Sequence, residues 1–170
     1  MEDRLIYESV FAGLAKQKVK YLVAGGIAVV LHGWARFTKD LDLMIDLDDA
    51  DNVLRFVSAM EKLYFRPAIP VPFASLADPS KRAQWLKEKG ALVFHLYNER
   101  DPLQRIDVFL SNPVDFGKAF KRRKTLKIGS IVIQAVSLKD LIDMKERAGR
   151  THDLEDLEIL KYIRNGKKAV

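Results

Sequence analysis

Cysteine is absent from the 170-residue chain, and histidine occurs only three times. Without cysteine there is no disulfide framework, no thiolate metal site and no thiol nucleophile. The spacing of His32, His95 and His152 fits no metal-binding motif, so packing or surface roles are expected for them. No hydrophobic run is long enough to cross a bilayer, and the start Met-Glu-Asp-Arg lacks the plan of a signal peptide. These absences predict a cytoplasmic protein without a membrane partner.

Neither positive nor negative charge is in large excess. Lys and Arg number 29 against 23 for Asp and Glu, which gives a net charge of +6 and a pI near 9.5. This balance permits a nucleotide or nucleic-acid partner without requiring one. The length and a hydrophobic content of 48% predict a single domain over residues 1–170 with its own buried core.

The order of the predicted elements favours the α+β class. Hairpins interrupt the strands and helices, so the chain does not follow strict β-α alternation. We expect a mixed central sheet with helices packed mainly on one face, built from residues of about 20–136, and a C-terminal helical part over 137–165. Asp48 is expected to cap the third helix, and the proline-bearing stretch 66–72 is predicted to be a loop. Periodicity predicts helices over 3–18, 26–34, 49–64, 80–89, 114–123, 138–148 and from 151 onward, and strands over 21–24, 40–47, 91–97, 104–110 and two within 126–136.

Two carboxylates share one face of the predicted strand 40–47. Apolar side chains alternate with Asp40 and Asp42, and strand residues point alternately to opposite faces. Two carboxylates roughly 7 Å apart repel by about 2 kcal/mol at an effective dielectric near 20. A divalent cation with oxygen ligands would relieve this repulsion. A half-exposed strand with an acidic solvent face is the alternative interpretation of this pattern alone.

Two glycines precede this acidic strand at a predicted strand-to-helix junction. Gly25 and Gly26 have no side chain, so a ligand can approach the backbone closely. The first N–H groups of the following helix and its positive dipole end can bind an anion. A phosphate cradle beside a carboxylate pair is what a metal-bound nucleoside triphosphate requires.

A third carboxylate, Asp107, lies in the mainly apolar predicted strand 104–110. An unpaired charge is unusual in such a strand. Asp107 is therefore expected to join Asp40 and Asp42 as the third ligand of the cation.

These residues resemble the motifs of the nucleotidyltransferase superfamily that includes DNA polymerase beta. The chain looks most like the small bacterial minimal nucleotidyltransferases and the AbiEii/MenT toxin-like branch. The resemblance extends from Tyr21 to Leu160, and its motifs are Gly25-Gly26 with Ala28 and Gly33, Arg36-x-Thr38-x-Asp40-x-Asp42, Arg105-Ile106-Asp107-Val108-Phe109, the block Leu138–Lys145, Ala148-Gly149-Arg150 and Asp153-Leu154-x-Asp156-Leu157. Many members of the superfamily have serine where this chain has Gly26.

The resemblance implies transfer of a nucleoside monophosphate from a nucleoside triphosphate such as ATP to an acceptor, with release of pyrophosphate. By position, Asp40, Asp42 and Asp107 would bind two Mg²⁺ ions, or Mn²⁺ in their place, and Asp107 would help to deprotonate the acceptor hydroxyl. The nucleotide would contact the glycine pair and the cationic or hydroxyl side chains of Arg36, Thr38, Lys145 and Arg150. Surface charges at a helix end explain Lys145 and Arg150 equally well.

The acceptor is left open by the sequence. An RNA or tRNA end, a protein hydroxyl and a small molecule all fit, and a toxin of a toxin–antitoxin pair is one role that would suit. Because the chain is short, a homodimer or an antitoxin partner is expected to assist it. A second hypothesis, from a different functional class, is a catalytically inactive module with the same fold that binds a nucleotide or a partner protein. A third hypothesis is a basic protein that binds nucleic acid without catalysing a reaction.

Overall fold

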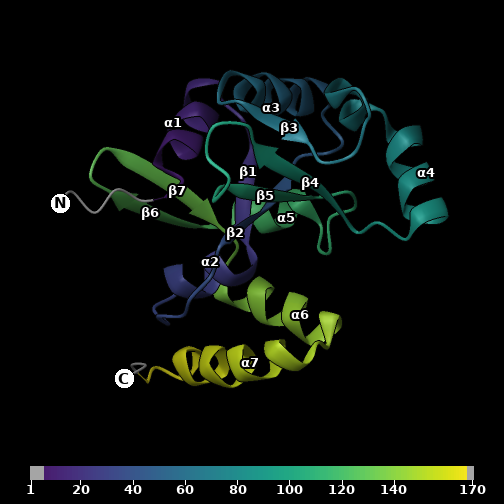
Figure 1. The fold of residues 1–170 in the computed structure, drawn as a ribbon. Coiled ribbons are helices and arrows are strands. Elements are labelled where there is room, and N and C mark those ends of the chain that lie inside the picture. Colours follow the sequence, from purple (N-terminus) through teal and green to yellow (C-terminus); the bar gives the residue numbers. More distant parts are fainter. Residues whose placement is uncertain (1–5, 168–170) are drawn as a thin grey trace.

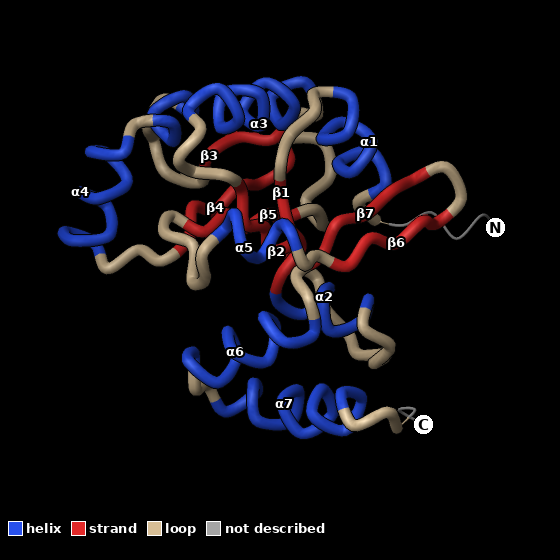
Figure 2. The backbone as a smooth tube through the Cα atoms, turned by 180° about the vertical axis from the view of Figure 1, so that it is seen from behind, coloured by secondary structure: helices blue, strands red, loops and turns tan. Residues whose placement is uncertain are grey.

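The computed structural model describes residues 6–167, which form a seven-stranded mixed sheet with helices packed against it (Figure 1, Figure 2). The strand order is β3-β4-β5-β2-β1-β7-β6. This confirms the α+β class and the mixed central sheet. The strands are β1 (Tyr21–Ala24), β2 (Asp40–Ile45), β3 (Phe65–Pro67), β4 (Val93–Asn98), β5 (Arg105–Phe109), β6 (Lys124–Ile128) and β7 (Ile131–Ala135), and the helices are α1 (Glu8–Lys16), α2 (Gly25–Leu31), α3 (Ala50–Lys62), the 3-10 helix η1 (Phe73–Ala77), α4 (Pro79–Lys89), α5 (Phe116–Lys121), α6 (Leu138–Ala148) and α7 (Thr151–Arg164).

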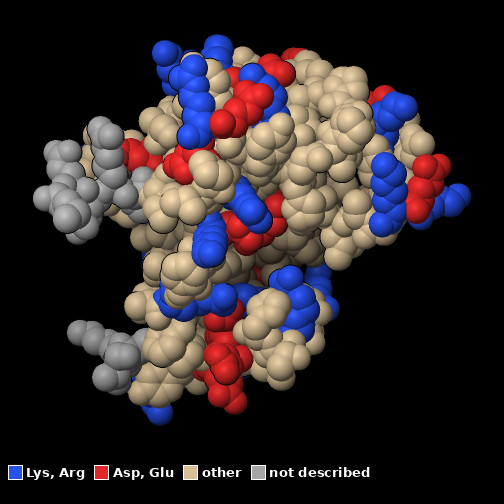
Figure 3. All heavy atoms as spheres, in the orientation of Figure 1, with Lys and Arg blue, Asp and Glu red and all other residues tan. Residues whose placement is uncertain are grey.

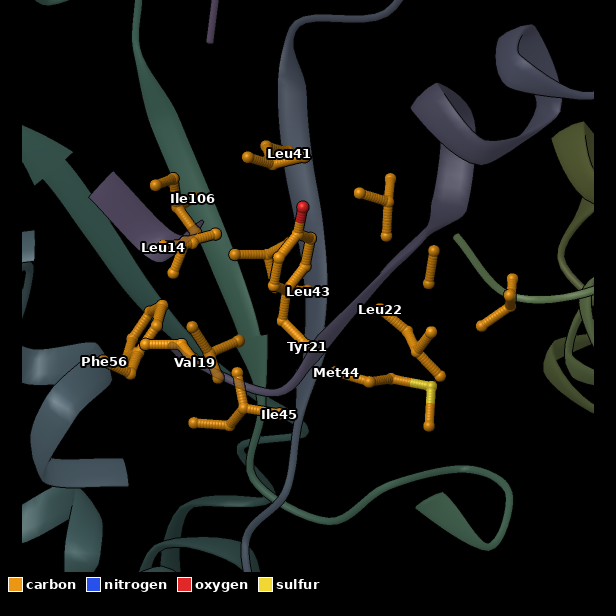
Figure 4. Close-up of a cluster of buried hydrophobic side chains, with 14 of the residues drawn as sticks. Leu14, Val19, Tyr21, Leu22, Leu41, Leu43, Met44, Ile45, Phe56 and Ile106 are labelled. Atoms are coloured by element: carbon orange, nitrogen blue, oxygen red, sulfur yellow. The ribbon is translucent and has the colours of Figure 1, made fainter. Parts of the chain in front are cut away.

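The centre of the sheet is buried on both faces. On one face Leu41 and Leu43 of β2 lie toward α1 and α3, and on the other face Leu22 and Met44 lie on the side of α2 (Figure 4). All four side chains have no exposed surface. Full burial of a side chain of this size contributes about 1.5–3 kcal/mol. The two central strands are therefore a rigid support for any residue that they carry.

The C-terminal helices α6 and α7 form an antiparallel pair that lies below the sheet in Figure 1. Ser137 caps α6, as its Oγ accepts a hydrogen bond from the Asp140 N–H, and Gly149 ends the helix in the left-handed conformation. α6 also contacts α2, so the pair is tied to the part of the sheet that follows β1. Within residues 6–167 no helix combines the length and apolar character that a bilayer crossing demands.

Two local predictions were wrong. The cap of α3 is Asp49 rather than Asp48, since the Asp49 side chain accepts from the Asn52 N–H. The predicted loop 66–72 is confirmed only for residues 68–72, because Arg66 and Pro67 belong to the edge strand β3, whose Phe65 is fully buried and whose Pro67 lies where an edge strand tolerates a missing N–H. The predicted start of the first helix at Asp3 lies outside the described residues.

Candidate functional site

Strand register brings the predicted carboxylates onto one face of the sheet. β2 and β5 are parallel neighbours, and Asp42 of β2 lies directly across from Asp107 of β5. Asp40 lies two residues earlier on the same face of β2, opposite Arg105. The three carboxylates therefore occupy adjacent positions, although they come from segments 65 residues apart in sequence, from position 42 to position 107.

Gly25 lies against the Asp42 carboxylate and leaves no room for a side chain. A Cβ atom at this position would come within 2.0 Å of Asp42 Oδ2, and the backbone has a positive φ of 61°. Both features require glycine. Burial, followed by the charges of Asp107 and Asp40, raises the pKa of Asp42 to about 7. The chain therefore packs its backbone around a carboxylate whose negative charge is poorly compensated.

Gly26 fits against the segment that leads into β2. A Cβ there would lie 2.6 Å from the Thr38 Oγ1 and 3.7 Å from the Arg36 guanidinium carbon. Arg36 forms an ion pair with Asp156 of α7. The sequence predicted that Arg36 contacts the nucleotide, and in the structure its guanidinium is paired with this helical carboxylate.

A buried ion cluster joins α6 to α7. We use this name for Lys145, Asp153 and Asp156 together with Arg36 and Arg150, which approach them from the outside. The Lys145 Nζ lies 2.8 Å from both an Asp153 oxygen and an Asp156 oxygen, and the Arg150 Nε lies 2.9 Å from Asp153. Asp153 has no exposed surface, and Asp156 and Lys145 are 3% and 6% exposed.

The buried ion cluster carries more positive than negative charge. It holds three cationic side chains and two carboxylates, as the ion pairs define it. Burial raises the pKa of Asp153, but hydrogen bonds and charges from Lys145 and Arg150 outweigh this effect and leave that pKa lowered. The same two cations also act on the sheet carboxylates, since the charges of Arg150 and Lys145 lower the pKa of Asp42. The cluster is therefore a net positive group close to the acidic row.

His95 is a member of the site that the sequence did not indicate. It lies on β4 across from Asp107 in the antiparallel β4–β5 hairpin, and its Nδ1 is 2.6 Å from Asp107 Oδ1. The His95 side chain is 63% exposed, whereas that of Asp107 is 20% exposed. A row of three side chains, Asp42, Asp107 and His95, thus crosses three neighbouring strands. The pairing register of the hairpin, and no spacing motif, is the signal that could have found His95.

The three carboxylates are the type of ligand that a hard divalent cation prefers, but they do not form a preformed metal-binding site. Oxygen donors are what Mg²⁺ and Mn²⁺ prefer, and the raised pKa of Asp42 reflects negative charge that a cation would relieve. Because Gly25 has no side chain, only its backbone lies against the Asp42 carboxylate. Among residues 6–167, no group of three or more His, Asp or Glu side chains already converges as a metal site. The residue types fit a metal ion, and Asp107 directs one oxygen to His95.

The surface is hollowed between the sheet and the α6–α7 pair. In the space-filling view, acidic and basic groups line this region and the α6–α7 helices form its lower side (Figure 3). The charges of Arg150 and Lys145 act on Asp42, so cationic side chains of the helical part lie near the acidic row. Such an arrangement suits a ligand that carries both an anionic group and a metal ion.

Comparisons with solved structures identify the fold. The lincosamide antibiotic adenylyltransferase LnuA, bound to lincomycin, superposes with a TM-score of 0.58 and 19% identity over 96% of this chain and 98% of LnuA. ANT(2″)-Ia in complex with adenylyl-2″-tobramycin superposes with a TM-score of 0.56 and 13% identity over 91% of this chain and 84% of that protein. An antigenic nucleotidyltransferase-like protein from Paracoccidioides brasiliensis gives a TM-score of 0.50 and 18% identity, covering 90% of this chain and 72% of its own.

Sequence comparison adds no closer relationship. No family model matches the chain, and no curated protein matches its sequence. At 13% to 19% identity, the structural likeness covers nearly the whole chain and concerns its architecture. The chain therefore has the fold of the nucleotidyltransferases.

Proposed function

We propose that this protein is a metal-dependent nucleotidyltransferase. It would transfer a nucleoside monophosphate from a nucleoside triphosphate to a hydroxyl-bearing acceptor. The observation that carries the proposal is the row of Asp40, Asp42 and Asp107 on one face of the sheet, where the Gly25 backbone lies against Asp42 and where burial and the neighbouring carboxylates raise the pKa of Asp42. A binding module without chemistry gains nothing from three clustered carboxylates, because their mutual repulsion destabilises the fold.

The reaction needs little covalent chemistry from the protein. The acceptor oxygen forms a bond to the α-phosphorus while the bond from that phosphorus to the bridging oxygen breaks, and the electron pair leaves with pyrophosphate. The hydroxyl proton would pass to solvent with the help of Asp107. Catalysis of this kind consists mainly of positioning and charge neutralisation. Mg²⁺ held by Asp40, Asp42 and Asp107 would neutralise phosphate charge and activate the acceptor oxygen when bound.

Other residues of the chain would bind and orient the triphosphate. Gly25 lies against Asp42, and Gly26 lies against Thr38 and Arg36. The backbone N–H groups of the two glycines would contact the triphosphate. Lys145 and Arg150 contribute through the net charge of the buried ion cluster, since their side chains are engaged by Asp153 and Asp156. Because the cluster carries net positive charge near Asp42, we expect the negatively charged pyrophosphate to leave toward it.

The structural neighbours suggest where to begin the search for substrates. One of them is an antibiotic adenylyltransferase and another is in complex with an adenylylated tobramycin, so ATP is the first donor to test. An RNA or tRNA end, a protein hydroxyl and a small molecule remain the acceptor classes for this chain. Modification of an essential RNA or protein would make the protein a toxin, and an antitoxin partner would then regulate it.

The experiment is label transfer from the four α-³²P nucleoside triphosphates in the presence of Mg²⁺. The acceptor fractions are total RNA, lysate protein and a panel of hydroxyl-bearing antibiotics. Transfer should fall by about 10²–10³-fold in Asp42→Asn and Asp107→Asn, because each substitution removes charge at the site of reaction. Asp51→Asn on the exposed first turn of α3 is the matched control and should retain transfer.

Metal dependence distinguishes the enzyme from the idle module. In the enzyme, EDTA abolishes transfer and Mg²⁺ or Mn²⁺ restores it. Binding of nucleotide that is independent of metal and unchanged in both Asp variants, with no transfer to any fraction, would support the binding module instead.

A further inference from the structure

A pocket of about 490 Å³ lies beyond the ends of the two strands that carry the acidic row. The helix α4 and the loops after β2 and β5 line it. The chain runs from Asp42 to the pocket residue Leu47, and from Asp107 to the pocket residue Leu110. At about 3.3 Å per residue, the pocket begins roughly 10–17 Å beyond the row. It is therefore separate from the proposed active site, and its volume is typical of small-molecule sites.

Apolar side chains line much of this pocket. Leu47, Leu110 and Phe116 are buried members of the core. Leu86 of α4 is half-buried and also lines the pocket. Because the core holds these side chains in place, they form a fixed surface on which the hydrocarbon part of a ligand can pack.

Arg82 is the cationic side chain of the pocket, and main-chain carbonyls already engage it. Its guanidinium donates to the Leu76 carbonyl at 2.7 Å and to the Leu47 carbonyl at 3.1 Å, and the residue is only 7% exposed. Burial lowers the pKa of Arg82, and the charges of Asp48 and Asp78 oppose this effect. Two carboxylates thus act on one guanidinium, so Arg82 does not leave the pocket with an excess of positive charge.

Two carboxylates line the same pocket. Asp49 and not Asp48 caps α3, so the Asp48 side chain has no capping role. Asp115 caps α5 through Oδ1, which accepts a hydrogen bond from the Lys118 N–H at 2.7 Å. Its Oδ2 takes no part in this bond. Asp48, Asp115 and Arg82 together give the lining a net negative charge.

Asn112 adds a buried acceptor to the lining. Its Nδ2 donates to the Ile45 carbonyl at 2.9 Å, which fixes the orientation of the amide. Its Oδ1 is buried, and among residues 6–167 no group donates a hydrogen bond to it. A buried oxygen without a donor destabilises the fold, and a ligand that supplies an N–H group would remove this cost.

We propose that this pocket binds a small organic cation, a primary ammonium group on an apolar chain. An ammonium group has three N–H donors and no acceptor, which matches the oxygens of Asp48, Asp115 and Asn112. Hydrogen bonds between an ammonium and a carboxylate are stronger than those between neutral groups. The apolar chain packs on Leu86 and Phe116. This site is additional to the nucleotidyltransferase function and does not depend on it.

Three probes of equal chain length test the charge of the ligand. Calorimetry on the full chain compares hexylammonium, hexanoate and 1-hexanol. We expect the Kd for hexylammonium to be at least 10-fold lower than the Kd for either of the other two. In ¹H–¹⁵N spectra, hexylammonium should shift the amide signals of residues 47–48, 82–86 and 110–116.

Substitutions at the carboxylates test the contacts of the ammonium group. Asp48→Asn and Asp115→Asn should each raise the Kd for hexylammonium at least five-fold. Asparagine is also a preferred N-cap, so α5 keeps its cap in the second variant. Asp51→Asn is the matched control, because it removes the same charge from the exposed first turn of α3, outside the pocket lining. Its Kd should stay within two-fold of the wild type.

Filling the pocket gives a test that does not alter its charge. Ala83 lines the pocket and is exposed on α4, so Ala83→Phe should block the pocket without disturbing the core. Hexylammonium binding should then be lost while the urea midpoint stays at the wild-type value. Wild-type binding by this folded variant would overturn the proposed location.

The remaining outcomes are equally distinct. Tighter binding of hexanoate would mean that Arg82 sets the charge preference, and equal or absent binding of all three probes would mean that the pocket has no preference for an ammonium group. Either result overturns the proposal. Shifts confined to the signals around Asp42 and Asp107 would assign the cation to the acidic row and also overturn it. None of these readouts measures label transfer, so the proposed function is tested separately.

Discussion

Asp42 on β2 and Asp153 on α7 are the same residue type in opposite electrostatic situations. The pKa of Asp42 is raised to about 7 by burial and then by neighbouring carboxylates. Burial acts on Asp153 in the same direction, but Lys145 and Arg150 reverse it and the pKa is lowered. Both aspartates lie near the same cationic side chains, and only Asp153 contacts them directly.

The difference supports the proposal that the acidic row binds a ligand, whereas the buried ion cluster stabilises the fold. The Asp153 carboxylate is fully paired, so its ion pairs hold α6 to α7. Asp42 retains charge that protein groups do not neutralise, and such uncompensated groups are typical of functional sites. The comparison predicts that the two regions respond in opposite ways to mutation, pH and metal.

The largest effect on stability is expected for Asp153→Asn. This change leaves Lys145 and Arg150 with one carboxylate fewer in a buried environment, and breaking a buried ion pair costs about 3–5 kcal/mol. Urea denaturation measures the loss. Glu158→Gln on the exposed side of α7 is the control and should change stability by less than about 0.5 kcal/mol.

Gly25→Ala should destabilise the protein by about 3 kcal/mol, from the positive φ and from displacement of the Asp42 carboxylate. Gly129→Ala is a close match, because Gly129 has a φ of 59° against 61° and no atom within 4 Å of the position that a Cβ would take. Thermal unfolding of the two variants isolates the cost of the Asp42 contact. Equal losses in both would show that the tight approach to Asp42 has no energetic consequence.

Asp42→Asn should stabilise the metal-free protein at pH 8, by about 2 kcal/mol. The folded-state pKa is raised from 3.8 to about 7, so stability from this group is present at low pH and is lost as pH rises from about 4 to 7. Removing the charge recovers part of that loss, which is at most about 4 kcal/mol. Urea midpoints at pH 5 and pH 8 in EDTA test this, and a variant that is less stable than the wild type at pH 8 contradicts it.

Arg36→Lys should have the smallest effect, about 1 kcal/mol. Arg36 pairs with Asp156 but is partly exposed, and Lys145 still pairs with the same carboxylate. Urea titration measures the loss of unfolding free energy in this variant. A loss as large as that of Asp153→Asn would mean that Arg36, and not Lys145, dominates the buried ion cluster.

Much of the acidic row could be predicted from the sequence because strand alternation fixes the face of each residue. Asp40 and Asp42 share a face by their spacing, and Asp107 stood out as a charge in an apolar strand. Gly25 was recognised by its position before the acidic strand. The structure adds the reason, which is direct contact between its backbone and Asp42.

Other parts depend on tertiary pairing that the sequence does not encode locally. His95 has no diagnostic spacing, and only the register of the β4–β5 hairpin places it on Asp107. Asp153 and Asp156 look like ordinary helical charges until α7 packs against α6. β3 was missed because three residues ending in proline carry almost no strand signal, and its pairing with β4 depends on the buried Phe65.

The most direct test of the account is the response of thermal stability to Mg²⁺ at pH 8. About 10 mM Mg²⁺ should raise the unfolding midpoint of the wild type by about 3 °C, because a cation that binds only the folded state stabilises it. Asp42→Asn should start at a higher midpoint and show no response, while Asp153→Asn should start lower and still respond. An equal response in the wild type and Asp42→Asn, or none in either, would contradict the claim that the acidic row is a metal site.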